Sequence, residues 1–144
     1  MAGVGDPALG ATGLSSLGEV ARDSGRPVAA RRLYGAALRR HVAIGSKRHM
    51  AYDLEGFSAA AGLERAGRQA LVYLGAAQAL RDETSSPLPP VEQAILDRIL
   101  APAVAALSAV ERQEALSQGR NQPLPATIAQ ALAELPRPGA PGAG

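Results

Sequence analysis

Small and apolar side chains recur every three or four positions along most of the chain, which is the spacing of amphipathic helices. In the second such segment Ala30, Tyr34, Leu38 and His41 fall on one stripe, while Arg39 falls on the other side. Proline and glycine separate the segments, as they do at helix starts and ends. The pattern predicts about six helices, over residues 12–24, 27–44, 48–63, 66–82, 90–118 and 124–135.

The fifth predicted helix contains Pro102, which has no backbone N–H to donate to the carbonyl of residue 98. A kink or break is therefore expected near residues 98–102. Two segments lie outside the predicted helices. Residues 1–11 are expected to be a flexible N-terminus, and the Pro- and Gly-rich residues 136–144 are expected to be a disordered tail.

The first four predicted helices carry the same pattern twice, forty residues apart. The first copy comprises Leu14, Leu17, Gly18, Ala21, Gly25, Ala30, Tyr34 and Ala37, and the second comprises Leu54, Phe57, Ser58, Ala61, Ala70, Leu74 and Ala77. Small residues at helix contacts with larger apolar ones between them match the tetratricopeptide pattern. The expected fold is all-α, a stack of antiparallel helix hairpins. Its parts are repeat one (12–44), repeat two (48–82) and a helical cap (90–135) that covers the second pair.

Composition narrows the class further. Aromatic residues make up only 3% of the 144 residues, so alanine and leucine must fill the core. The absence of cysteine excludes disulfides, thiol catalysis and thiolate metal sites. No apolar run reaches the roughly 20 residues of a membrane-spanning helix, and residues 1–13 lack the features of a signal peptide. A cytoplasmic protein with no membrane contact is therefore expected.

Three stretches carry a resemblance to a known family, namely residues 54–57 (Leu-Glu-Gly-Phe), 74–81 (Leu-Gly-Ala-Ala-Gln-Ala-Leu-Arg) and 87–92 (Pro-Leu-Pro-Pro-Val-Glu). In this order and spacing the chain resembles the C-terminal, tetratricopeptide-like region of large ATP-binding bacterial transcriptional regulators of the LuxR and AfsR/SARP types. The resemblance runs from about Leu14 to Leu135. It implies a helical sensor or interaction scaffold whose nucleotide-binding and DNA-binding domains lie elsewhere, so that the chain is a truncated, split or stand-alone part. Arg65 departs from the family, which usually has glycine at that turn.

Candidate chemistry is sparse. His41 and His49 are eight residues apart across Gly45, so they do not form an i, i+4 metal pair, and we interpret His41 as a half-buried packing residue and His49 as a surface residue. The serine pairs lack a positioned base, and no G-x-x-x-x-G-K-[ST] phosphate loop occurs. We expect no catalytic, cofactor-binding or metal-binding residues, and hence a protein that is not an enzyme.

The expected function is protein binding, either to a separate partner or to other domains of a regulator. The first helix of each pair would line the binding surface, with Glu19, Asp23, Asp53 and Glu55 as candidates that face away from the core. The alternative is a small nucleic-acid-associated protein that uses a basic patch of Arg39, Arg40, Lys47 and Arg48, although no aromatic residues interleave and such binding through this chain alone is not favoured. Exposed apolar edges would also allow self-association, end to end.

Overall fold

The computed structural model describes residues 7–135, and side chains from residue 10 onward. Within that range all regular secondary structure is helical, as the apolar spacing predicts, and comprises seven helices, against about six expected. Their bounds are α1 (Pro7–Asp23), α2 (Pro27–Ile44), α3 (Lys47–Leu63), α4 (Gly67–Glu83), α5 (Pro90–Val104), α6 (Ala109–Asn121) and α7 (Leu124–Ala133). The predicted tail 136–144 lies outside the described residues.

The expectation of a flexible segment over residues 1–11 is wrong for residues 7–11, which belong to α1; residues 1–6 lie outside the described range. Proline suits the first turn of a helix because its missing N–H would have no partner there. Tertiary packing also holds this turn. Ala11 is fully buried, and the guanidinium of Arg40 on α2 lies directly over Gly10.

Helices α1 to α4 repeat every 20 residues, since they begin at residues 7, 27, 47 and 67. A residue with left-handed backbone geometry follows each one at the same interval: Gly25, Gly45, Arg65 and Ser85, with φ of 68°, 72°, 62° and 49°. At Arg65 two backbone hydrogen bonds close the helix, Arg65 N to Gly62 O and Ala66 N to Ala61 O. This is the Schellman ending, which glycine adopts without strain. The strict period of two helices per 40 residues exceeds the 34 of a standard tetratricopeptide repeat.

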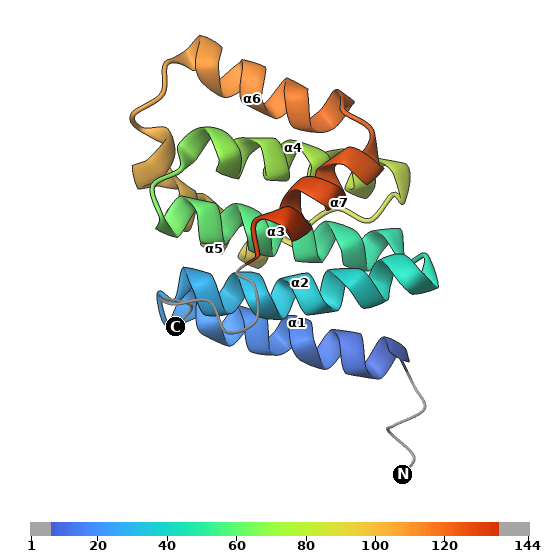
Figure 1. The fold of residues 1–144 in the computed structure, drawn as a ribbon. Coiled ribbons are helices and arrows are strands. Elements are labelled where there is room, and N and C mark those ends of the chain that lie inside the picture. Colours follow the sequence, from blue (N-terminus) through green and yellow to red (C-terminus); the bar gives the residue numbers. More distant parts are fainter. Residues whose placement is uncertain (1–6, 136–144) are drawn as a thin grey trace.

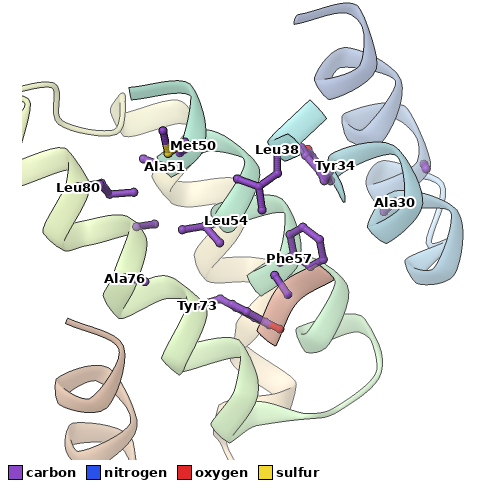
Figure 2. Packing of buried hydrophobic residues seen from close by; sticks show 13 residues of the cluster. Ala30, Tyr34, Leu38, Met50, Ala51, Leu54, Phe57, Tyr73, Ala76 and Leu80 are labelled. Atoms are coloured by element: carbon purple, nitrogen blue, oxygen red, sulfur yellow. The ribbon is translucent and has the colours of Figure 1, made fainter. Parts of the chain in front are cut away.

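The four helices pack as two antiparallel hairpins, α1 with α2 and α3 with α4, and α2 packs on α3 to stack them (Figure 1). Leu54 and Phe57 of α3 lie between Leu38 of α2 and Tyr73 of α4 (Figure 2). The ring of Tyr34 packs against Gly18 of α1 and Gly56 of α3, in space that larger side chains at these positions would fill. A Cβ on Gly18 would lie 2.9 Å from this ring, and one on Gly56 would lie closer still. Small residues thus bring α1, α2 and α3 close together.

The single helix predicted over residues 90–118 is wrong, because residues 105–108 separate α5 from α6. The break is not at residues 98–102 as expected. Pro102 lies inside α5 and is exposed, so its missing hydrogen bond is tolerated near the end of the helix. Ser108 then starts a new helix with a complete capping box. Its hydroxyl accepts from the backbone N–H of Glu111, and the Glu111 carboxylate accepts from the backbone N–H of Ser108.

The last three helices cover the second hairpin from different directions. Helix α5 packs on α3 through Leu96 and Leu100, while α6 packs on α4. Backbones meet closely there, because a Cβ on Gly75 would lie 3.1 Å from the carbonyl carbon of Leu116. Helix α7 lies on the opposite side of the stack from α5 (Figure 1). Its apolar side, with Ile128, Ala131 and Leu132, packs with core residues of α2, α3 and α4. Leu135, just after it, packs against Gly35 of α2.

Candidate functional site

The groove with the most varied lining runs along the N-terminal half of α3, beside the connector 84–89. It is a cavity of about 370 Å³. We call this cavity the α3 groove; its lining residues are Arg48, His49, Tyr52, Arg81, Ser86, Pro87, Leu88, Pro89 and Glu92. The lining mixes cationic, aromatic, apolar and acidic groups.

Arg81 of α4 builds the floor of the α3 groove. Its Nε and Nη2 atoms donate to the two carboxylate oxygens of Glu55 at 3.0 and 2.8 Å, and its Nη1 donates to the carbonyl of Ser86 at 3.2 Å. The guanidinium therefore ties the connector to α3. Burial raises the pKa of Glu55, and the bidentate bond with Arg81 opposes that shift.

Tyr52 forms the wall of the α3 groove nearest the first hairpin. Its hydroxyl donates to the carboxylate of Glu19 on α1. Beside it lies Arg22, which is 8% exposed; its Nε donates to Asp23, and its Nη1 lies 3.9 Å from Glu92 of α5. Arg22 Nη2 has no hydrogen-bond partner within residues 10–135. Charged groups from α1 and α5 and the Tyr52 hydroxyl from α3 therefore meet at this wall.

A second polar cluster lies inside the stack, where α1, α2 and α3 meet. Asp53 of α3 is fully buried. It accepts hydrogen bonds from Ser15 Oγ at 2.7 Å and engages His41 Nδ1 at 2.5 Å. The ring of His49 stacks on that of His41 with centroids 4.8 Å apart. Burial raises the pKa of Asp53 to about 8 and lowers the pKa of His41, so the pair holds one proton between them near neutral pH.

This cluster is not a catalytic arrangement. A serine nucleophile needs its hydroxyl on the imidazole, but Ser15 bonds to the carboxylate instead. His41 is 1% exposed, and its Nε2 is buried without a partner, so no substrate can reach it. The cluster joins three helices and acts on stability. His41 is thus more deeply buried than the half-buried position expected from the sequence, and His49 is partly buried.

Two of the four predicted partner-binding residues do not face outward. Asp53 is 0% exposed and Glu55 is 8% exposed, so the expectation that they lie on the free surface is wrong. Each is buried because it has polar partners: Ser15 and His41 for Asp53, and Arg81 for Glu55. Those partners are 12 to 38 residues away, and helical spacing alone does not reveal them.

The other two predicted residues lie on α1. Asp23 is exposed and pairs with Arg22, and Glu19 is partly buried under Tyr52. The sequence interpretation missed Tyr52, Arg81 and Leu88 as lining residues of the α3 groove. Leu88 carried one usable signal, as an apolar side chain set among three prolines in an otherwise polar connector.

The basic patch residues gather around the turn between α2 and α3. Arg39, Arg40 and Arg48 are exposed, and Lys47 forms an ion pair with Glu83 at 3.0 Å. Arg40 leans away from the others, over Gly10 of α1. The structure therefore separates the four residues: Lys47 is neutralised, Arg40 lies on the α1 side, Arg48 lines the α3 groove, and Arg39 is exposed on α2.

Searches over the described part of the chain identify no cluster of three or more His, Cys, Asp or Glu that could hold a metal ion. None of the helices described here has the length and apolarity needed to cross a membrane. In comparisons with known proteins, no family model, curated protein or solved structure matches this chain.

Proposed function

We propose that the protein is a non-catalytic interaction scaffold that binds a peptide segment of a partner in the α3 groove. The observation that supports this best is the lining itself. Arg48 is exposed and forms no ion pair within the described residues, and Tyr52 and Leu88 offer aromatic and apolar surface beside it. Stacked helix pairs form extended surfaces, which repeat proteins use for binding.

The partner segment would carry a carboxylate for Arg48 and an apolar side chain for the surface around Leu88. The resemblance to LuxR- and AfsR-type regulators supports the wider context of the proposal. In that context the partner is another domain or subunit of a transcriptional regulator, and the scaffold relays a signal to its DNA-binding part.

Site-specific photocrosslinking in cells that natively make the chain tests this proposal. A photoreactive phenylalanine analogue replaces Leu88, which lines the α3 groove, and in a matched control it replaces Val110, which is 66% exposed on α6. A discrete cross-linked protein is expected from position 88 only, and Arg48→Glu should reduce its yield at least several-fold. Equal cross-linking at positions 88 and 110 would refute the groove as the binding surface.

If the partner is part of a transcriptional regulator, the same experiment has a second expected outcome. The captured partner should itself carry a DNA-binding or nucleotide-binding domain when it is identified by mass spectrometry. A partner with neither domain would leave the groove proposal standing and reject the regulator context.

One observation favours the nucleic-acid alternative: Arg39 and Arg48 are exposed and form no ion pair among the side chains described, residues 10–135. A gel-shift assay at low salt separates this alternative from peptide binding. Retardation that Arg39→Glu and Arg40→Glu abolish, and that falls steeply with added salt, would support it. Binding that is indifferent to both changes would exclude the basic patch.

A further inference from the structure

The outer face of α1 is apolar and uncovered. Leu17 is 55% exposed and Val20 is 62% exposed, and Gly13 and Ser16 are exposed beside them. Positions 13, 16, 17 and 20 differ by three or four, so they form one stripe along the helix. Apart from the chain neighbours of Gly13 and the adjoining backbone of α1, no atom of the described range lies within 4 Å of where a Cβ on Gly13 would be.

The equivalent face of α3, in the second repeat, shows how such a stripe is buried. Forty residues further on, the equivalent positions on α3 are Asp53, Gly56, Phe57 and Ala60. All four are buried, and this is the face that packs on the preceding hairpin, since Asp53 contacts α1 and α2 and Gly56 lies under a ring of α2. On α1 the same face therefore has the form of a stacking surface, and nothing in the described range covers it.

The charged side chains of α1 have partners within the chain. Glu19 accepts from Tyr52, Arg22 is buried, and Asp23 accepts from Arg22. The stripe itself is neutral. An identical stripe can therefore approach it without meeting a like charge, which would cost free energy across an interface.

We propose that a second copy of this chain covers the stripe, with the two α1 helices antiparallel about a two-fold axis. When the crossing is centred between Ser16 and Leu17, each large side chain faces a small one. Val20 lies over Gly13 of the partner copy, and Leu17 lies over Ser16 of the partner copy. The open space at Gly13 receives the valine, so the stripe is complementary to itself, as a two-fold interface requires.

Head-to-tail stacking of copies is disfavoured by the other end of the stack. The outer side of α6 exposes Glu111, Arg112, Gln113 and Glu114, a charged and polar surface with no match to Leu17 and Val20. Pairing through α1 alone closes after two copies and yields a dimer instead of a filament. The proposal is independent of peptide binding, because the stripe contributes no residue to the α3 groove.

Sedimentation over a wide concentration range tests the dimer. The interface is small, so association is expected at roughly tens to hundreds of micromolar, towards a mass twice the 14.7 kDa of one chain. A double variant, Leu17→Glu with Val20→Glu, should remain monomeric at every concentration with an unchanged helical CD spectrum. The matched control Val110→Glu, on α6, should dimerise as the wild type does. A wild-type chain that is monomeric at about 1 mM, or that dimerises regardless of the double variant, would overturn the proposal.

Disulfide trapping tests the antiparallel geometry, and the absence of native cysteine makes it clean. The variant Gly13→Cys with Val20→Cys places two thiols about 10 Å apart on one helix, too far for an internal bond. Across the proposed two-fold axis, each thiol faces the other thiol of the partner copy. Oxidation should yield a covalent dimer on a non-reducing gel, whereas a double variant with the same seven-residue spacing at exposed positions of α6, Glu114→Cys with Asn121→Cys, should stay monomeric. Larger ladders, or no dimer, would contradict the antiparallel arrangement.

Discussion

Replacement of Gly119 by alanine tests how closely α6 approaches α4. A Cβ at position 119 would lie 2.8 Å from the carbonyl carbon of Val72 and 3.0 Å from the amide nitrogen of Ala76. Ordinary carbon contacts are about 3.5–4.0 Å, so the added methyl overlaps both atoms by up to about 1 Å. Both atoms belong to the backbone of α4, and no rotamer change can move them aside. The two helices must separate.

The cost can be worked from this geometry. Overpacking a close contact costs about 1–3 kcal/mol, and a clash with rigid backbone on two sides belongs near the upper limit. Replacing a helical glycine by alanine also stabilises the fold by about 0.5–1 kcal/mol, because glycine loses more conformational entropy on folding. We therefore expect Gly119→Ala to lower the free energy of unfolding by about 2 kcal/mol.

Gly13→Ala is the matched control. It is the same substitution in a helix, but apart from the adjoining residues of α1 itself no atom of the described range lies within 4 Å of the added Cβ. The entropy gain then stands alone, and the free energy of unfolding should rise by about 0.5–1 kcal/mol. Urea unfolding followed by CD at 222 nm, in dilute solution where the α1 stripe is unpaired, measures both variants, and an unchanged m-value shows that the unfolding transition is comparable.

The two variants should thus change stability in opposite directions. A Gly119→Ala variant as stable as the wild type, or a shift of the same sign for both variants, would refute the argument that α6 touches α4 backbone to backbone. If amide exchange became fast in α6 alone, the substitution would have destabilised that helix locally and not the whole fold.

Three further predictions concern stability. Arg65→Gly should raise the free energy of unfolding by about 1 kcal/mol, because glycine adopts a φ of 62° without the strain of a side chain; no change in the urea midpoint would contradict this. The wild-type free energy of unfolding should fall by about 1–2 kcal/mol between pH 6.5 and 8. The unfolded His41 releases its proton near pH 6.5, whereas the folded pair with Asp53 keeps one until about pH 8. Asp53→Asn should remove this decline in pH-dependent urea titrations, and its persistence would assign the decline to other groups. Arg81→Met should cost about 3 kcal/mol, because it leaves Glu55 buried and unpaired, whereas Arg81→Met with Glu55→Leu should lie within about 1 kcal/mol of the wild type; thermal melts that rank the single and double variants equally would reject the ion pair as the cause.

Local signals made much of the fold predictable. Pro27 and Gly25 mark the boundary between α1 and α2, and the predicted second helix, 27–44, agrees with the structure residue for residue. Arg65 was singled out as a residue at a glycine position, and its left-handed φ confirms the turn. Such features depend on backbone conformation within about five residues, which the sequence specifies directly.

The break between α5 and α6 was misplaced for a local reason. Pro102 drew attention to residues 98–102, yet the capping box of Ser108 and Glu111 sets where the next helix begins. That signature was present in the sequence. Nothing in the sequence indicated that α5 packs on α3 while α6 packs on α4, because this arrangement depends on contacts between helices that are far apart along the chain.

The sequence by itself determined where most helices begin and end and which stripe of each is apolar, because both follow from hydrogen bonding and spacing within a few turns of helix. Only the tertiary structure decided which polar side chains are buried. Asp53 and Glu55 carry carboxylates, which are usually exposed, but hydrogen-bond partners on other helices make their burial favourable. The same assembly placed Tyr52, Arg81 and Leu88 around one groove and left Leu17 and Val20 uncovered on α1, because exposure is a property of neighbours and not of the side chain alone.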